Sequence, residues 1–280
     1  MGRLKSAISL AVGTVADFAM PHLGSDIDAA RNNAQAARLK RVIIQARMRR
    51  AKLSKDADGL QDTLTAFWRS ATGDTFHAGN ARDSYERFLN NHTQAIDGLD
   101  QFVLNSELGF SRMVEIGCGN GWLLDYCAEK LPWIAEAVGI DVNASAIDRA
   151  AAAQPPGSPL QFVCADPQDW LTAHPRAGTV LVSNGGVLEY FTQANFDRLL
   201  ATLARARPAA LLLLEPVDVG HDLDQQADSY AFTSAGWCGS ETTFSHNHRV
   251  RLQQAGFEVV FAEEIHFDHQ PGVMMLGVLR

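Results

Sequence analysis

Two patterns of apolar residues divide the chain near residue 100. From about Ser111 onward, short apolar runs alternate with segments in which apolar residues recur every three or four positions. Short apolar runs are typical of buried strands, and the longer spacing is typical of helices that pack through one face. The alternation predicts a parallel sheet covered by helices on both faces. The expected strands span residues 112–117, 135–141, 160–164, 178–184 and 209–216, and the expected helices span 122–131, 144–153, 193–206 and 246–257.

The last two apolar runs change the expected topology. Residues 257–265 and 272–280 are strand-like and are joined only by the turn-rich segment HFDHQP. Because this connection is too short for a crossover between parallel strands, the two strands should be antiparallel neighbours. The predicted fold class is therefore α/β, with a Rossmann-like seven-stranded sheet, an antiparallel C-terminal hairpin and helices on both faces.

The first hundred residues lack this alternation and predict helices. We expect a helical N-terminal extension or lid at 1–100 and a sheet-containing domain at 101–280. Within the extension, residues 38–55 contain eight cations and no acid. A basic amphipathic helix there could contact a membrane surface, a nucleic acid or an acidic protein, or pack on its own acidic chain. Its apolar residues recur at helical spacing: Leu39, Val42, Ile43, Ala46 and Leu53.

Charge is unevenly distributed between the two parts. Residues 1–100 carry 14 Lys and Arg against 11 Asp and Glu, a net charge of +3. Residues 101–280 carry 10 against 21, a net charge of −11. An acidic surface disfavours a large polyanion lying across the sheet-containing domain. We therefore expect a small-molecule substrate and no nucleic acid partner.

The sequence favours a cytoplasmic protein. No apolar run approaches the roughly 20 residues that cross a bilayer, so no stable membrane insertion is expected. The four cysteines form no C-x-x-C pair and fit free thiols in a reducing compartment. The N-terminus loosely matches a signal peptide and a myristoylation pattern. A short amphipathic helix fits it better, with one face formed by Ile8, Val12, Val15 and Ala19.

The stretch MVEIGCGNGW, Met113 to Trp122, places three glycines two residues apart after the first expected strand. Glycine allows a positive φ, and a glycine-rich turn at this position binds ligands at the carboxyl ends of the strands. The dinucleotide fingerprint G-x-G-x-x-G requires a glycine where Trp122 stands. The pattern indicates an adenosine-like ligand that need not carry a diphosphate, and dinucleotide binding is the alternative.

The segment VEIGCGNG resembles motif I of the class I S-adenosylmethionine-dependent methyltransferases, and the resemblance extends from about residue 111 to residue 280. Further landmarks follow in order: GIDVN, VCADPQDW, SNGGVLEYF and the closing hairpin. The resemblance implies S-adenosyl-L-methionine as cofactor, with Asp141 accepting hydrogen bonds from the ribose hydroxyls and Asp166 contacting the adenine amino group. No metal site is expected, because His221, His266 and His269 and the acids near them show no metal-ligand spacing. The implied cofactor-binding residues are Glu115, Gly117, Cys118, Gly119, Gly121, Trp122, Asp141, Val142, Asp166, Pro167, Asn184 and Gly185.

Candidate catalytic residues follow from the chemistry of methyl transfer to oxygen, which benefits from a general base. Ser245 is expected to cap the last helix, which would place His246 and His248 in its first turn, where the helix dipole favours neutral imidazole. Either histidine could instead cap the helix locally. Glu189 and Tyr190 follow the fourth strand, where the family often keeps substrate-facing polar groups. Many relatives have histidine where Tyr190 stands.

Two aromatic regions are expected to line or cover the substrate pocket. One is the long segment 217–244, and the other precedes the sheet-containing domain. Either set could instead pack against the body of the protein. The aromatic residues are Tyr230, Phe232 and Trp237 in the first region and Phe67, Trp68, Phe76 and Tyr85 in the second.

The predicted function is methyl transfer to a small molecule, at oxygen, in sugar or specialised metabolite biosynthesis. Residues 183–186 read Ser-Asn-Gly-Gly, whereas amide- and adenine-N-methylating enzymes commonly carry N-P-P-Y/F there. Two alternatives stay open: a nucleic-acid or protein methylase that docks through residues 38–55, and a cofactor-binding regulatory protein without catalysis. The sequence does not decide the acceptor, the methylated atom, the use of a base or the formation of a homodimer through the N-terminal helices.

Overall fold

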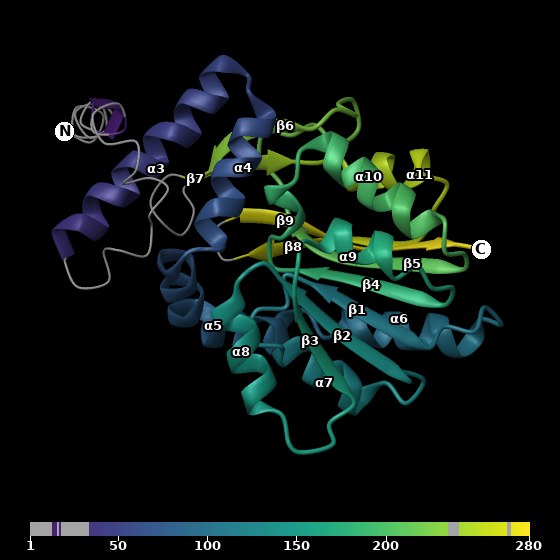
Figure 1. Cartoon of the computed structure of the whole chain (residues 1–280). Helices are drawn as coiled ribbons and strands as arrows, with labels where there is room; N and C mark the ends of the chain where they lie inside the picture. The colour runs from purple at the N-terminus through teal and green to yellow at the C-terminus, as the bar shows by residue number, and fades with distance from the viewer. Residues whose placement is uncertain (1–12, 16, 18–33, 235–240, 268–269) are drawn as a thin grey trace.

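The computed structural model describes residues 13–15, 17, 34–234, 241–267 and 270–280. Its centre is a seven-stranded sheet of order β3-β2-β1-β4-β5-β9-β8 (Figure 1). Strands β1 to β5 pair in parallel, and β9 runs antiparallel to both β5 and β8. The predicted α/β class and its antiparallel C-terminal pair are confirmed. The strands are β1 (Arg112–Ile116), β2 (Glu136–Asp141), β3 (Leu160–Cys164), β4 (Thr179–Asn184), β5 (Ala209–Pro216), β8 (Glu258–Phe267) and β9 (Gln270–Leu279).

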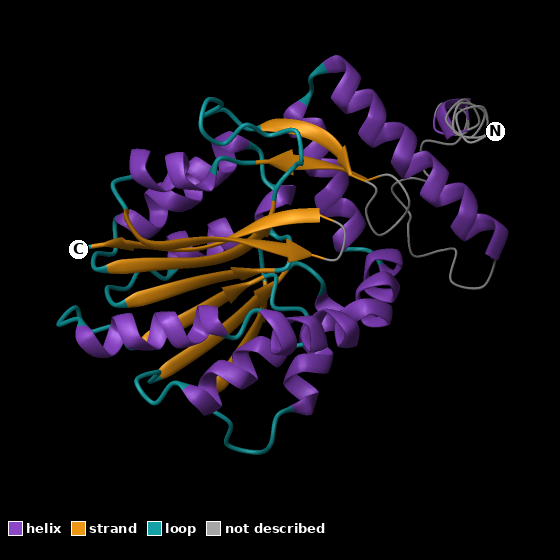
Figure 2. Cartoon of the chain, turned by 180° about the vertical axis from the view of Figure 1, so that it is seen from behind, coloured by secondary structure: helices purple, strands orange, loops and turns teal. Residues whose placement is uncertain are grey.

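Helices cover both faces of this sheet, as Figure 2 shows from behind. Successive residues of a strand point to opposite faces, so the leucines of β5 divide between two apolar layers. Leu212 and Leu214 join the layer that contains α6 and α7, whereas Leu211 and Leu213 join the layer that contains α9, α10 and α11. The helices beside the sheet are α6 (Gln94–Asn105), α7 (Trp122–Lys130), α8 (Ala144–Ala153), α9 (Pro167–Ala173), α10 (Gln193–Ala204) and α11 (His248–Gln254).

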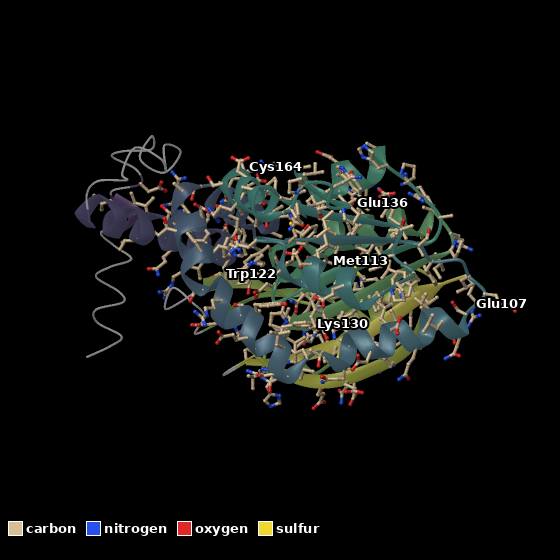
Figure 3. The ribbon with its side chains drawn as sticks, turned by 90° about the horizontal axis from the view of Figure 1, so that it is seen from below. Glu107, Met113, Trp122, Lys130, Glu136 and Cys164 are labelled. Carbon is tan, nitrogen blue, oxygen red and sulfur yellow. The ribbon has the colours of Figure 1, made fainter. Side chains whose placement is uncertain are left out.

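The strand order reverses direction at β1, which pairs with β2 on one side and with β4 on the other. Ligands of open α/β sheets bind at such a switch point, beyond the carboxyl ends of the strands. Met113 near the start of β1 lies inside the molecule, whereas Trp122 follows the glycine-rich turn and Glu107 lies at the periphery (Figure 3). The topology therefore places the glycine-rich turn where a ligand is expected.

The N-terminal extension includes α3 (Ala34–Ser54), α4 (Ala57–Trp68) and α5 (Ala71–Asn91). Helices α3 and α4 pack against a separate two-stranded sheet formed by β6 (Tyr230–Ser234) and β7 (Glu241–Ser245). Most of this hairpin lies in segment 217–244, for which the sequence predicted no strands, and β7 continues to Ser245. The apolar contact is formed by Ile44, Met48, Ala51, Leu60, Leu64, Phe67 and Phe244.

The basic segment is helical as predicted, and part of its charge is neutralised within the chain. Arg47 and Arg50 of α3 bind the buried Asp17 at 2.7 and 3.1 Å. Two residues assigned to apolar helix faces do not pack: Val15 is 69% exposed and Leu53 is 77% exposed. No helix in the described ranges is both long and apolar enough to cross a bilayer. Predictions for the side chains of Ile8, Val12, Ala19, Leu39, Phe76 and Trp237 lie outside the described residues.

Candidate functional site

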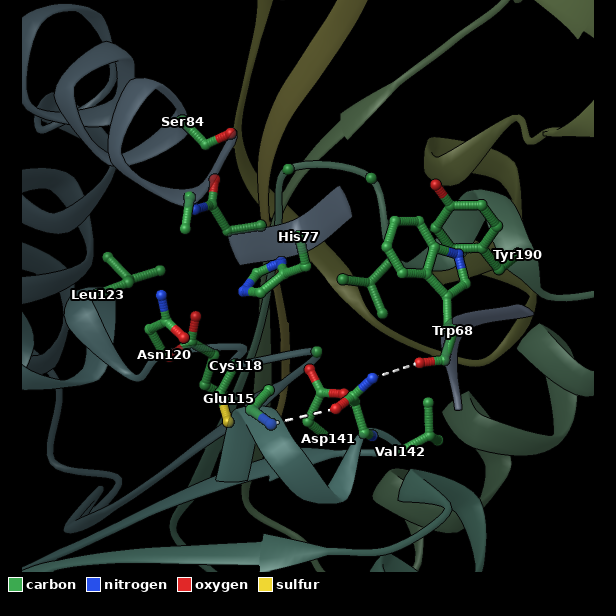
Figure 4. A pocket seen from close by; sticks show the side chains of 18 of the residues that line it. Trp68, His77, Ser84, Glu115, Cys118, Asn120, Leu123, Asp141, Val142 and Tyr190 are labelled. Carbon is green, nitrogen blue, oxygen red and sulfur yellow. Dashed lines mark hydrogen bonds between the residues drawn. The ribbon is translucent and has the colours of Figure 1, made fainter. Parts of the chain in front are cut away.

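A cavity of about 260 Å³ lies at the carboxyl ends of the central strands, between the sheet and helices α4 and α5. Figure 4 shows several of its lining side chains, which come from both sides. Most of the predicted cofactor-binding residues line this cavity, whereas Gly119 and Gly121 complete the same loop without lining it. The lining residues among them are Glu115, Gly117, Cys118, Trp122, Asp141, Val142, Asp166, Pro167, Asn184 and Gly185.

The glycine-rich turn requires glycine for two separate reasons. Gly117, Gly119 and Gly121 all have positive φ angles, of 65°, 52° and 75°. Residues with a side chain rarely adopt such angles. A Cβ atom at Gly117 would also overlap with Val187, and one at Gly119 would overlap with His77. The sequence attributed these glycines to the approach of a ligand. The structure adds that side chains of the same protein pack against the turn.

Asp141 at the end of β2 is fixed by two backbone donors. Its Oδ2 atom accepts the N–H of Gly119 at 3.0 Å, and Oδ1 accepts the N–H of Asn143 at 2.8 Å. Burial raises the pKa of Asp141, while these two hydrogen bonds and the nearby His77 lower it. A carboxylate has about four lone-pair sites, so Asp141 can accept further hydrogen bonds from a ligand in the cavity.

Glu115 in β1 is buried at the floor of the cavity. The carboxyl group forms a hydrogen bond with the backbone of Leu124. Its Oε2 atom is buried without a hydrogen-bond partner among the described residues. Burial, followed by the charge of Asp141, raises the pKa of Glu115 to about 8. Because buried polar atoms are almost always paired, the unpaired oxygen indicates a group that a ligand would satisfy.

Asp166 has a local structural role beside the role implied by the family resemblance. Its side chain caps α9 by accepting the N–H groups of Gln168 at 2.9 Å and Asp169 at 3.2 Å. Pro167 occupies the first helical position, where a missing N–H costs nothing. Both residues line the cavity, so the cap also fixes this part of the wall.

Helices α4 and α5 form the roof of the cavity and are tied to the sheet side. The Nδ2 atom of Asn143 donates to the carbonyl oxygen of Trp68 at 2.7 Å. The Trp68 ring packs edge-on against Tyr190, with 5.3 Å between the ring centroids. Trp68 and Tyr85 line the cavity, as expected for two of the aromatic residues before the sheet-containing domain, whereas Phe67 of α4 is buried in the apolar contact with α3.

Helix α5 also supplies polar lining residues that the sequence did not indicate. His77, Asn80, Ser84 and Arg87 line the cavity at the three-to-four spacing of one helix face, and His92 follows at the helix end. The Nε2 atom of His77 is buried without a hydrogen-bond partner. The sequence could have shown that these polar residues share one face of a helix. It could not have shown that this face lies over the glycine-rich turn.

His246 and His248, the candidate bases, do not line the cavity. Both are fully buried, and His246 uses both ring nitrogens, bonding Ser229 Oγ at 2.6 Å and the carbonyl oxygen of Leu188 at 2.9 Å. Burial lowers the pKa of His246 to about 4 and lowers that of His248 as well. The structure therefore brings neither histidine to the place where the predicted cofactor-binding residues gather.

The expected helix cap at Ser245 is wrong. The N-cap of α11 is Asn247, whose side chain accepts the N–H of Val250 at 3.2 Å. Ser245 is instead the last residue of β7, and its hydroxyl accepts the N–H of Asp218 at 2.9 Å. The helix begins later than predicted because the preceding segment continues as a strand.

The other two candidate catalytic residues separate in the structure. Tyr190 lines the cavity, whereas Glu189 is buried beside Gly186 and does not. Both belong to a short 3₁₀ helix, η2 (Leu188–Tyr190). This helix is fixed from below by the fully buried Glu215, which accepts the N–H of Leu188 at 3.0 Å.

The described aromatic residues of segment 217–244 do not line the cavity. Tyr230 donates its hydroxyl hydrogen to Asp218 at 2.7 Å, and Phe232 is buried. Neither side chain belongs to the cavity lining. They stabilise the hairpin and the loop before it instead.

Residues 113–207 match the family model described as a methyltransferase domain. This segment contains the glycine-rich turn, Asp141, Asp166 and the segment after β4. No curated protein matches the chain.

Solved structures share the fold at low sequence identity. A magnesium protoporphyrin IX methyltransferase from Synechocystis PCC 6803, solved with bound S-adenosylmethionine, is 15% identical, with a TM-score of 0.51. The match covers 78% of this chain and 96% of that chain. A candidate S-adenosylmethionine-dependent methyltransferase from Listeria monocytogenes is 14% identical, with a TM-score of 0.51, over 67% of this chain and 99% of that chain.

Proposed function

We propose that the chain is a class I S-adenosylmethionine-dependent methyltransferase, since residues 113–207 match a methyltransferase domain, and that it methylates a small-molecule acceptor at an oxygen atom. The observation that carries the proposal is the position of the cavity beneath α4 and α5. The turn expected to bind the cofactor lines this cavity together with residues of both helices. An acceptor must therefore be small enough to enter it.

The residues around the cavity fit S-adenosyl-L-methionine. Asp141 retains acceptor capacity, and Glu115 and His77 each present a buried polar atom without a partner. These groups suit hydroxyl and amino hydrogen-bonding partners. When bound, the cofactor supplies a methyl group activated by its sulfonium. The chain supplies positioning and exclusion of water, which account for much of the rate of such reactions.

The size of the cavity supports a small acceptor. Its volume of about 260 Å³ is close to the lower end of the roughly 300–1,000 Å³ that ligand pockets span. A nucleic acid or a folded protein would have to insert its reactive group between the sheet and helices α4 and α5. Those helices are held by the Asn143–Trp68 hydrogen bond and by an ion pair between Asp74 and Arg149 at 2.7 Å.

His92 is the best-placed candidate for a general base. It lines the cavity and is 3% exposed. Burial lowers its pKa, followed by the charge of Arg87, while a hydrogen bond to the backbone of His266 raises it. A histidine that donates one N–H to a carbonyl keeps its other nitrogen as an acceptor. Such a nitrogen could take the proton of an acceptor hydroxyl.

Methyl transfer should label the low-molecular-weight fraction of a cell extract and leave its macromolecules unlabelled. The measurement uses cofactor with a ¹³C-labelled methyl group, followed by separation of the extract by size. The NMR shift of the product then separates O-methyl from N-methyl groups. Label in RNA, DNA or protein above that of an extract incubated without the enzyme would contradict the proposal. Asp141→Ala, which should bind the cofactor more weakly, should label the product less than wild type.

His92→Gln should reduce kcat at least tenfold and leave the affinity for S-adenosylhomocysteine unchanged, because a lost general base typically costs 10²–10⁴-fold. The acidic limb of the pH profile for kcat/KM should also disappear, since protonation of the imidazole causes it. Kinetics on the acceptor identified above, with calorimetry on the product cofactor, test both points. An unchanged kcat would show that methyl transfer needs no base at this position.

A further inference from the structure

His77 of α5 lies directly over the glycine-rich turn. A Cβ atom at Gly119 would overlap with its Nε2 and Cε1 atoms, so the imidazole is in close contact with the backbone there. Helix α5 directs His77 into the cavity on the same face as Ala81, Ser84 and Phe88. Figure 4 shows the ring between α5 and the turn. The helix thus delivers one polar side chain to the turn expected to bind the cofactor.

The imidazole of His77 has a ring nitrogen that lacks a hydrogen-bond partner in the described structure. Its Nε2 atom is buried without a hydrogen bond among the described residues. Burial lowers the pKa of His77, Asp141 raises it, and Arg149 lowers it again. A neutral imidazole has one N–H donor and one acceptor nitrogen. Because an unpaired buried nitrogen is costly, a bound ligand is the natural source of its partner.

We propose that His77 and Asp141 together bind a ribose hydroxyl of the cofactor. A carboxylate after the second strand of this fold type accepts a ribose hydroxyl, and Asp141 keeps lone pairs beyond those used by Gly119 and Asn143. A hydroxyl both donates and accepts, so one group can bridge the carboxylate and the imidazole. The inference holds for any methyl acceptor.

This contact would couple the lid to the cofactor. The start of α5 is held to α8 by the ion pair between Asp74 and Arg149. The end of α4 is held by the hydrogen bond from Asn143 to Trp68. A bond from His77 to the ribose adds a link that exists only when the cofactor is bound. Cofactor binding should therefore protect α5 from amide hydrogen exchange.

His77→Ala should weaken the binding of S-adenosylhomocysteine about fivefold, the loss expected for one neutral hydrogen bond. His77→Gln, whose amide can reach a similar position, should recover part of this loss. Arg82→Ala is the matched control, because Arg82 is exposed on α5 and pairs only with Glu86 in the described structure. Calorimetry on the full chain measures all four proteins, and thermal denaturation verifies that each is folded.

The hydroxyl itself is tested with 5′-methylthioadenosine and its 2′-deoxy and 3′-deoxy forms. Removing the hydroxyl that His77 binds should weaken the binding of the nucleoside to wild type. The same removal should have little further effect on binding to His77→Ala, so the two changes should be non-additive. Additive losses with both deoxy forms, or His77→Ala binding as tightly as wild type or more tightly, would overturn the proposal. Tighter binding would mean that His77 obstructs the site. Failure of wild type to bind S-adenosylhomocysteine would instead contradict the cofactor assignment.

Discussion

Asp141→Ala should weaken the binding of S-adenosylhomocysteine at least tenfold, a loss of about 1.4 kcal/mol. The substitution removes the acceptor expected to bind the ribose. It also releases the N–H groups of Gly119 and Asn143, which the carboxylate holds at 3.0 and 2.8 Å. Hydrogen bonds to a charged group contribute roughly 1.5–3 kcal/mol each, so both the affinity and the shape of the turn should suffer. Isothermal titration calorimetry measures the affinity directly.

Asp141→Asn separates the two effects. Its amide oxygen can still accept one of the two backbone N–H groups, so the turn should be better preserved than in the alanine variant. Binding that falls in Asp141→Ala but stays near the wild-type level in Asp141→Asn would show that Asp141 only shapes the turn, and unchanged binding in both variants would contradict any role of Asp141 in binding. Binding that falls in both, with little loss of thermal stability in Asp141→Asn, would assign the carboxylate to the ligand.

The sheet and the glycine-rich turn could be predicted because their signals are local. The leucines of β5 form a continuous apolar run, and Gly117, Gly119 and Gly121 follow a strand directly. A short connection between the last two strands leaves only an antiparallel arrangement. Each of these features depends on neighbours in the sequence, so the pattern alone determines it.

The residues of α4 and α5 that cover the cavity could not be predicted, because their position depends on contacts between segments that are far apart in the sequence. His77 and His92 line the cavity only because α5 lies over the carboxyl ends of the central strands. No period in the sequence encodes that position. The positions of His246 and His248 also depend on distant contacts: β7 extends to Ser245, and both rings are buried against Phe196 of α10. A residue before a predicted helix was mistaken for a cap because the preceding strand was not recognised.

Glu215→Ala should lower the free energy of unfolding by roughly 3 kcal/mol or more, because it leaves several buried donors without a partner. The carboxyl group of Glu215 accepts the hydroxyl of Ser183 at 2.6 Å. It also accepts the N–H groups of Val187 and Leu188, the latter at 3.0 Å. Ser183→Ala removes one of these bonds and should cost only about 1 kcal/mol. Denaturant unfolding of both variants measures the difference.

The substitution Glu215→Ala should also alter the wall of the cavity. The segment that Glu215 fixes contains Gly185 and Tyr190, which line the cavity wall. Glu215→Ala should therefore weaken S-adenosylhomocysteine binding although Glu215 itself lies outside the lining. A destabilised variant with unchanged cofactor affinity would show that the wall keeps its shape without this anchor.

The pH dependence of stability tests the same carboxyl group independently. Burial raises the pKa of Glu215 to about 7, against the four hydrogen-bond donors that lower it. Because the folded-state pKa lies above the unfolded value of about 4.3, the folded state binds the proton more tightly. The contribution to stability is then complete below about pH 4.3 and is lost as the pH rises through about 7. Glu215→Gln, which resembles the protonated acid, should remove this dependence, so wild type should lose stability relative to it across that range. A difference that grows in favour of wild type as the pH rises would mean that the donors keep the buried carboxylate ionised.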